Sequence, residues 1–173
     1  MADDELVEWI DEAGRTLGIV TRARLRAENL RHRSVAVIVR SASASARRPH
    51  PAVLAHRRAD WKDVWPGAWD LAFGGVVAAG ESYRAAAQRE LAEEAGLTAA
   101  MGRRLGSFVY ADAFVAAHCE VFEVISDGPF HPADGEVVEL CWVSTAELLS
   151  WVAAHTMCPD NVAGVIPLLT APS

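Results

Sequence analysis

The chain has 173 residues, of which 51% are apolar and 23% charged, and its 16 basic and 23 acidic residues give a formal net charge of −7. This size and composition exclude a disordered protein and predict a single domain spanning residues 1–173. Because no apolar run reaches the roughly 18 residues of a membrane span and the acidic N-terminus is unlike a signal peptide, we expect a cytoplasmic protein that does not bind membranes. The acidic balance also argues against nucleic acid as the partner.

The cysteines are Cys119, Cys141 and Cys158. An odd number of cysteines without C-x-x-C spacing favours neither a disulfide framework nor a zinc site. We therefore expect reduced thiols that mostly fill the core.

The N-terminal part of the chain predicts a hairpin, a short helix and two strands. Apolar segments at 6–10 and 17–20 flank a turn at 11–14, and Thr21 is placed to cap a polar helix over 22–29. This hairpin and helix account for residues 1–33. Residues rich in β-branched side chains predict strands at 34–39 and 52–55, with an exposed loop at 41–51 between them.

The rest of the chain alternates between loops, strands and helices. An ordered loop at 61–73 should lead into a strand at 68–72, and Ser82 should cap a helix over Tyr83–Ala95 that Gly96 ends. Further strands are expected at 105–110, 119–125 and 137–143. A capping-box pattern at 144–147 predicts a helix that runs to residue 154, and a last short helix follows Asp160. This order predicts an α/β fold, in which helices cover both faces of a mixed sheet.

Three glutamates lie within five residues of the predicted helix. At about 100° per residue, Glu90, Glu93 and Glu94 share one face. Such a cluster alone is most often a solvated helix surface. When like charges are held together, however, they raise one another's pKa values unless a cation neutralises them, and a divalent ion with oxygen ligands does so. The cluster therefore points to Mg²⁺ or Mn²⁺.

The surroundings of the glutamates favour a functional site. Gly75 and Gly80 allow the backbone of the preceding loop to approach a ligand closely. Arg89 adjoins the acidic face and is within reach of Glu81 in that loop. The segment 75–97 matches the pattern G-x(5)-E-x(7)-R-E-U-x-E-E-x-G-U, with U aliphatic, at all nine specified positions, the last glycine being Gly96. This pattern is the Nudix box, and the chain resembles the Nudix family.

The resemblance implies a fold, a reaction and a set of ligands. The fold is an α/β/α sandwich, and the reaction is hydrolysis of a diphosphate linkage, typically in a nucleoside diphosphate joined to another group, by attack of water on phosphorus. Mg²⁺ or Mn²⁺ would be held by Glu90 and Glu94, with Glu93 as a further ligand or base and the Gly75 carbonyl as a candidate ligand. Arg89 would orient the glutamates, with Glu81 as its candidate partner, while Gly80 and Gly96 shape the motif.

The chain also resembles, more narrowly, the branch around isopentenyl-diphosphate isomerase. This resemblance is carried by the opening hairpin, by His32-Arg33-Ser34 and by the pattern Arg57-Arg58…Lys62…Pro66-Gly67-Ala68-Trp69. Phe73 and Gly75, however, occupy the places of the catalytic Cys and a metal-binding His of that isomerase. Without the thiol we do not expect isomerase chemistry. His32 stands where that family has a metal ligand; we interpret it as structural or substrate-facing, with metal ligation as the alternative.

The base and the substrate contacts are open to more than one interpretation. Glu136 is a second candidate for the base or an extra ligand, and Glu139 a third, against simple exposure on a strand. At least one of Arg57, Arg58 and Lys62 is a candidate for a phosphate contact. The arginine-rich segment 22–33 is interpreted as a polar helix face rather than a substrate clamp. Trp61, Trp65 and Trp69 are candidates for stacking on a base, although core packing is commoner for such residues.

Two functions from different classes follow from these residues. The leading hypothesis is a metal-dependent diphosphatase acting on a small molecule. The alternative is a non-catalytic nucleotide-binding or regulatory module on the same fold. The sequence leaves the substrate and the oligomeric state open, with a homodimer among the options.

Overall fold

The computed structural model describes residues 2–42, 51–133 and 135–171, and most of the predicted loop at 41–51 lies outside these ranges. The described residues form eight strands and several helical segments. The strands are β1 (Leu6–Ile10), β2 (Thr16–Thr21), β3 (His32–Arg40), β4 (Ala52–Arg58), β5 (Trp69–Asp70), β6 (Arg104–Ala111), β7 (Ala116–Ile125) and β8 (Val137–Ser144). The helical segments are η1 (Ala2–Asp4), α1 (Arg22–Ala27), α2 (Tyr83–Ala95), α3 (Leu148–Ala154), η2 (Asn161–Val165) and α4 (Ile166–Thr170).

The long strand β3 organises the sheet. It pairs in parallel with β7 along its whole length, from His32 opposite Ala117 to Arg40 opposite Ile125. At its two ends it meets β1 and β4 in antiparallel pairing, while β6 pairs with β7 and both β5 and β8 pair with β4. The sheet is therefore mixed, as the sequence predicts.

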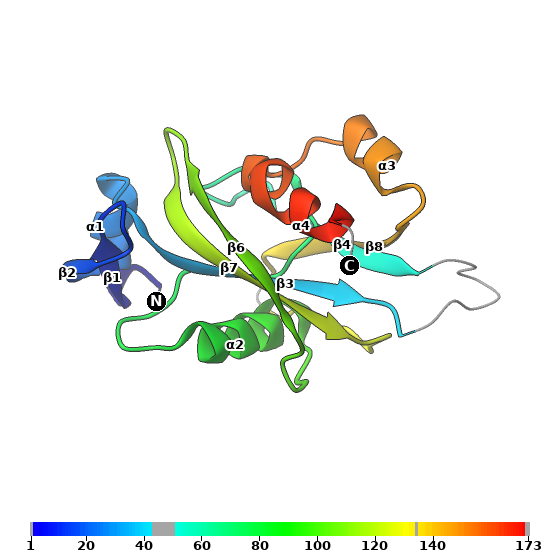
Figure 1. Ribbon diagram of the computed structural model, residues 1–173, viewed down its shortest axis with the longest axis horizontal. Coiled ribbons are helices and arrows are strands. Elements are labelled where there is room, and N and C mark those ends of the chain that lie inside the picture. Colours follow the sequence, from blue (N-terminus) through cyan, green and yellow to red (C-terminus); the bar gives the residue numbers. More distant parts are fainter. Residues whose placement is uncertain (1, 43–50, 134, 172–173) are drawn as a thin grey trace.

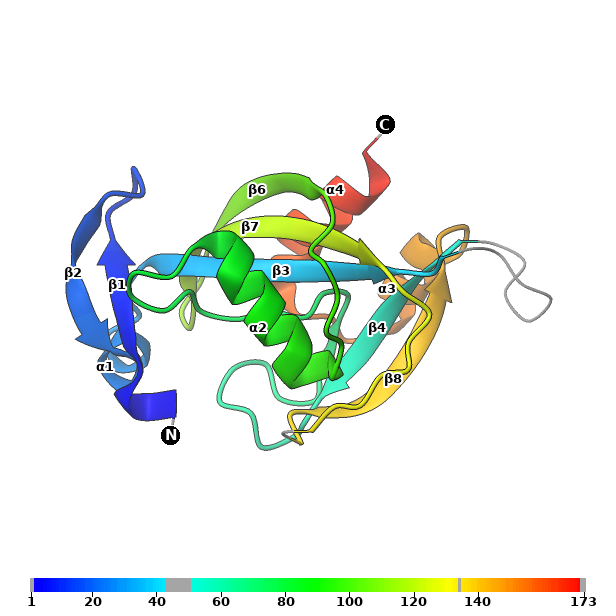
Figure 2. The same ribbon diagram turned by 90° about the horizontal axis from the view of Figure 1, so that it is seen from below.

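Helices cover both faces of this sheet, with α2 on one side and α3 and α4 on the other (Figures 1 and 2). The alternation of side chains along β3 explains the two layers. Val35 and Val37 pack into the cluster that contains Leu91 of α2. Ile38 packs into the second cluster, with Ile166 of α4. The α/β/α sandwich expected from the sequence is thus confirmed.

The predicted ends of helix α2 are confirmed. The Ser82 side chain accepts a hydrogen bond from the Ala85 N–H (3.2 Å), and Gly96 adopts the left-handed conformation (φ +63°) that terminates the helix. The Thr21 side chain likewise caps α1 by accepting from the Arg24 N–H (3.3 Å). This helix stops at Ala27 rather than at residue 29, because Asn29 takes a left-handed backbone conformation (φ +46°).

Two predicted elements are wrong in detail. The strand expected at 68–72 is only the two-residue β5, because the next two backbone N–H groups donate to side chains, that of Leu71 to Asn161 and that of Ala72 to Asp70. The capping box at 144–147 does not form. Ser144 remains the last residue of β8, and the helix begins only at Leu148, without a side-chain cap.

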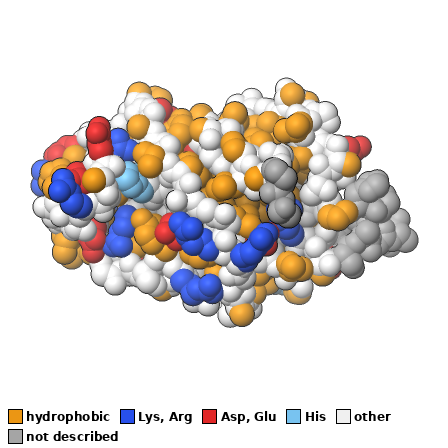
Figure 3. Space-filling view, viewed as in Figure 1, with side chains coloured by type: hydrophobic (Ala, Val, Ile, Leu, Met, Phe, Trp, Pro, Cys, Tyr) orange, Lys and Arg blue, Asp and Glu red, His pale blue; other side chains and the backbone are white. Residues whose placement is uncertain are grey.

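The cysteines agree with the prediction of reduced thiols that mostly fill the core. All three cysteines are free thiols; Cys119 and Cys158 are buried and Cys141 is half-buried. On the face seen in Figure 3, acidic and basic side chains are interspersed with apolar ones. Among the described residues, none of the helices is long and apolar enough to cross a bilayer.

Candidate functional site

Helix α2 and the segment that precedes it are held against β3. Val35 and Val37 of β3 donate backbone hydrogen bonds to the carbonyls of Gly75 (3.0 Å) and Phe73 (2.7 Å). A Cβ at Gly74 would lie 2.0 Å from the Val35 carbonyl oxygen, so only glycine allows this close crossing. On the helix, Leu91 is fully buried against the sheet. The backbone around the glutamates is therefore fixed on both sides.

Two of the three glutamates are buried beside this segment. Glu90 and Glu94 are each only 6% exposed. Glu94 Oε2 accepts a hydrogen bond from the Gly74 N–H (2.9 Å), and a Cβ at Gly75 would lie 2.5 Å from Glu90 Oε1. The side chain of Glu93 differs, because it is about half exposed (53%). The predicted shared face thus consists of two buried carboxylates and one at the rim.

Arg89 links the helix to its preceding loop, as the sequence predicts. Its guanidinium donates to Glu81 through Nε (3.2 Å) and Nη2 (3.0 Å), and to the carbonyl of Val76 through Nη2 (3.1 Å). The same side chain donates through Nη1 to Glu90 (2.7 Å) and Glu93 (3.2 Å). With these contacts Arg89 fixes the orientation of two of the three carboxylates.

Burial disfavours the charged forms of both carboxylates, in spite of their hydrogen bonds. Burial raises the pKa of Glu94 well above its usual range, and the nearby charge of Glu90 raises it further. Burial also raises the pKa of Glu90, although the adjacent Arg89 opposes the shift. Two such carboxylates side by side favour a bound cation over a bare pair of charges.

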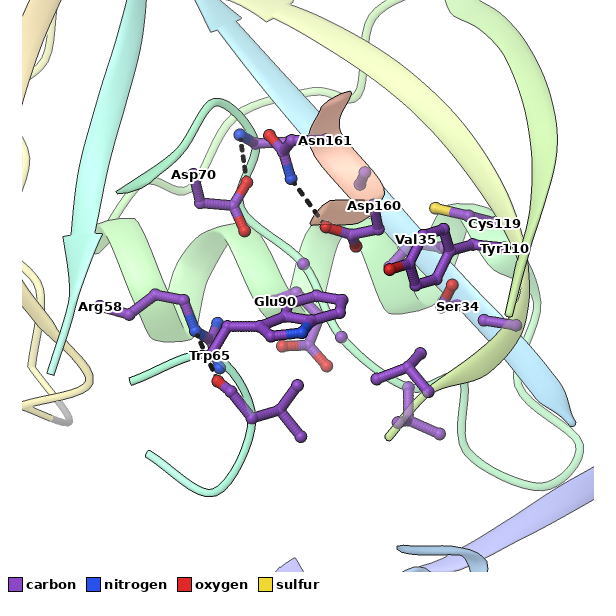
Figure 4. Close-up of a pocket in the computed structure, with 18 of the residues that line it drawn as sticks. Ser34, Val35, Arg58, Trp65, Asp70, Glu90, Tyr110, Cys119, Asp160 and Asn161 are labelled. Carbon is purple, nitrogen blue, oxygen red and sulfur yellow. Dashed lines mark hydrogen bonds between the residues drawn. The ribbon is translucent and has the colours of Figure 1, made fainter. Parts of the chain in front are cut away.

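These glutamates line a cavity of about 240 Å³, part of which is shown in Figure 4. The cavity also brings together most of the other residues singled out in the sequence: Gly75, Arg58, Lys62, Glu136, His32 and Trp65. Glu136 and Lys62 form an ion pair with each other inside it. Gly80 and Glu81 belong to the loop that supports α2 rather than to the cavity wall.

Other predicted contacts lie outside the cavity. Arg57 pairs with Asp60 (3.0 Å) and more loosely with Glu139 (3.8 Å), and neither Arg57 nor Glu139 lines the cavity. Trp61 is 65% exposed, whereas Trp69 packs edge to face against Trp151. Of the three tryptophans, only Trp65 therefore faces the cavity.

The structure adds lining residues that the sequence did not indicate. Asp70 and Asp160 lie together at one end of the cavity, where Asn161 donates to Asp160 (3.1 Å) (Figure 4). Burial and the charge of Asp70 raise the pKa of Asp160 to about 7. The two aspartates are 90 residues apart in the chain and belong to no motif, so only the fold brings them together.

The arginine-rich segment is also placed differently from the prediction. Arg24 is exposed and pairs with Glu28, as expected for a polar helix face. Arg22 and Arg26, one helical turn apart, instead line the cavity. The helical spacing of the two arginines was visible in the sequence, but the side of α1 that meets the rest of the protein was not.

The residues of the isomerase comparison have clear structural positions. Phe73, at the place of the isomerase cysteine, is fully buried and stacks on His56 with ring centroids 4.6 Å apart. His32 is 3% exposed, and its Nδ1 lies 3.0 Å from the Leu30 carbonyl oxygen. Burial lowers its pKa to about 4. Phe73 thus provides no group that could move a proton.

The donor set at the glutamates fits a hard divalent cation. Carboxylate oxygens and a backbone carbonyl are the ligands that Mg²⁺ and Mn²⁺ prefer. The Gly75 carbonyl accepts from Val35 and has a second lone pair available. Among the described residues, no three His, Cys, Asp or Glu side chains are already grouped closely enough to hold an ion. A metal here would therefore require the half-exposed Glu93 to give up its hydrogen bond with Arg89 and turn toward the buried pair, or non-protein ligands to complete the shell.

A family model, related sequences and solved structures all indicate the same protein family. The NUDIX domain model matches residues 30–162. An uncharacterized Nudix hydrolase of Pseudomonas aeruginosa is 34% identical over 161 residues, which cover 93% of this chain and 91% of the relative. The crystal structure of DR0079 from Deinococcus radiodurans superposes with a TM-score of 0.76 at 26% identity, covering 96% of this chain and all of that one. A MutT protein from Methanosarcina mazei superposes with a TM-score of 0.59 at 26% identity, over 69% of this chain and 81% of that one.

Nudix hydrolases generally use divalent metal ions. The motif, the sandwich and these relatives agree with one another. The chain belongs to the Nudix family and is a Nudix hydrolase, which implies pyrophosphohydrolase activity.

Proposed function

We propose that this protein uses Mg²⁺ or Mn²⁺ to hydrolyse a diphosphate linkage in a small molecule, most simply a nucleoside diphosphate joined to another group. The observation that carries the proposal is the pair of buried carboxylates, Glu90 and Glu94, whose pKa values are both raised in the cavity. If these two carboxylates had only a structural role, their burial would destabilise the folded protein without a compensating interaction. A cation bound between the two carboxylates would stabilise their charged forms and so offset the destabilisation.

The residues around the glutamates would have two roles, to bind the metal and to orient the carboxylates. Glu90 and Glu94 would hold the metal, with the Gly75 carbonyl as a further ligand and Glu93 as either a further ligand or the base. When bound, the metal neutralises the diphosphate and increases the acidity of water. Arg89 holds Glu90 and Glu93 in orientation through its hydrogen bonds to both.

The proton of the attacking water needs an acceptor on the protein. Glu93 is the first candidate, because it lines the cavity and keeps about half of its surface open to solvent. Glu136 is the second, but its ion pair with Lys62 must open before it can accept a proton. Lys62 and Arg58, which line the same cavity, would bind phosphate oxygens. The products would be a nucleoside monophosphate and a second phosphate compound.

The test is a turnover screen over nucleoside triphosphates, nucleotide sugars, dinucleotides and coenzyme A esters, with Mg²⁺ and with Mn²⁺. We expect at least one compound to be cleaved, and Glu94→Gln to lower kcat at least about 100-fold without unfolding the protein. Glu139→Gln, which changes a carboxylate outside the cavity, is the matched control. Full activity of Glu94→Gln would refute the site. Nucleotide binding without cleavage of any compound would favour the non-catalytic module.

A further inference from the structure

Helix α1 directs two arginines into the cavity and one away from it. Arg22 and Arg26 are four residues apart, which places them on the same side of the helix, and both line the cavity. Arg24 lies between them in sequence, and its Nε donates to Glu28 (2.8 Å) on the exposed surface. Leu25, only 1% exposed, anchors the helix against the protein. The helix therefore presents a fixed pair of guanidinium groups to the site.

Arg26 is poorly neutralised in this position. Its Nε is buried, and no atom of the described residues accepts a hydrogen bond from it. Its ion-pair partner is Asp63 at 3.7 Å, a side chain that is 64% exposed. Burial lowers the pKa of Arg26; Asp63 opposes this shift, and the charges of Arg22 and Arg58 add to it. A buried donor without an acceptor is costly, so an anion would stabilise this arrangement.

The other cations around the cavity have closer partners. Arg22 donates to Glu5 (2.9 Å), Lys62 pairs with Glu136, and the Nε of Arg58 donates to the Val64 carbonyl (3.2 Å). In Figure 4 a dashed line marks this hydrogen bond of Arg58. Arg26 is thus the least satisfied of these four cations, and the charges of two other arginines act on it.

The chemistry of this cluster selects a class of ligand. Guanidinium groups match the oxygens of phosphate in both charge and geometry, and several of them together can bind a doubly charged group. The carboxylates of α2 line the same cavity but would repel an anion unless a cation lies between. Phosphate oxygens near Glu90 and Glu94 therefore need a metal, whereas phosphate oxygens near Arg26 do not.

We propose that Arg26, together with Arg22 and Arg58, forms a phosphate-binding subsite, which holds one phosphate group of the substrate directly, without a metal ion. The assignment of this anion to a diphosphate substrate rests on the proposed function, but the subsite itself does not. The subsite positions the diphosphate in the cavity by binding one of its phosphate groups directly, while the carboxylates of α2 line the same cavity.

The test measures binding of methylenediphosphonate, a diphosphate analogue that cannot be hydrolysed at its bridge, to metal-free protein by isothermal titration calorimetry. We expect the wild-type protein to bind it, and Arg26→Gln to weaken binding at least about tenfold. Arg26→Lys keeps the positive charge but loses the planar set of N–H donors, and it should weaken binding less than Arg26→Gln does. Arg24→Gln, on the same helix but facing solvent, is the matched control and should bind as the wild type does.

The outcomes separate this proposal from the proposed function. No binding to folded wild-type protein, or equal binding by Arg26→Gln and Arg24→Gln, would overturn the subsite without affecting the turnover screen. Loss of binding in Arg26→Gln alone would support the subsite, even if every compound in the screen remained uncleaved. Because Arg26 is partly buried, circular dichroism should show that Arg26→Gln or Arg26→Lys is folded before its binding is compared.

Discussion

Glu90 and Glu94 differ from Glu93 in the environment that the fold gives them. The sequence shows three equivalent carboxylates on one helical face, and helical geometry alone cannot rank them. Burial ranks them, because the backbone at Gly74 and Gly75 closes over Glu90 and Glu94 but leaves Glu93 half exposed. The buried pair is therefore the better candidate for permanent metal ligands, and Glu93 for a group that moves.

At the residue scale, the burial of Glu94 predicts that function and stability oppose each other. Glu94→Gln removes a buried charge and can still accept the hydrogen bond from Gly74. We therefore expect this variant to melt roughly 2–4 °C higher than the wild type in metal-free buffer at pH 8, as measured by calorimetry. Added Mg²⁺ or Mn²⁺ should raise the melting temperature of the wild type but not that of the variant. A lower melting temperature of the metal-free variant would contradict this account of the site.

At the scale of elements, Gly80 and Gly96, which lie before and after α2, have unequal roles. Gly80 and Gly96 both adopt positive φ (+76° and +63°), so a side chain strains the backbone at either position. A Cβ at Gly96 would also lie 2.3 Å from the carbonyl oxygen of His131, whereas nothing lies within 4 Å of one at Gly80. Gly96 thus ends α2 and allows the loop after β7 to pack against it.

This difference predicts unequal effects of alanine. Gly80→Ala should lower the free energy of unfolding by about 1 kcal/mol, the cost of the left-handed conformation alone. Gly96→Ala should lower it by roughly 2–4 kcal/mol, because the backbone contact must also shift. Urea denaturation of the two variants measures the comparison. Equal losses would mean that the contact with the His131 carbonyl is easily relieved.

At the scale of the whole molecule, the sequence predicts the local structure and the motif better than the assembly of the cavity. The caps of α2 and the Arg89–Glu81 contact depend on short spacings, and they are confirmed. The mixed sheet follows from the order of the elements along the chain and is confirmed as well. The cavity depends on the fold bringing distant segments to one place, such as Asp70 with Asp160 and the arginines of α1 with the glutamates of α2, and no local pattern encodes this. The failed capping box shows the same limit, because strand pairing of Ser144 with Ala52 overrides a helix signal.

His56 lies in the core, outside the cavity, and its protonation makes the free energy of unfolding depend on pH. It is fully buried against Phe73, and burial lowers its pKa from 6.5 to about 4. Between these two pH values the unfolded chain binds a proton at His56 that the folded protein does not, so acidification through this window favours unfolding. The stability linked to His56 is therefore complete above pH 6.5 and falls by about 3 kcal/mol as the pH approaches 4.

The prediction is tested with His56→Gln, which cannot take up this proton. Its free energy of unfolding, measured by urea denaturation at several pH values in metal-free buffer, should fall less steeply than that of the wild type between pH 6.5 and 4. His131→Gln changes an exposed histidine and is the control. Because the buried His32 has the same direction of shift, His56→Gln should reduce the slope without abolishing it. An unchanged slope would show that His56 gains solvent or a partner before the protein unfolds.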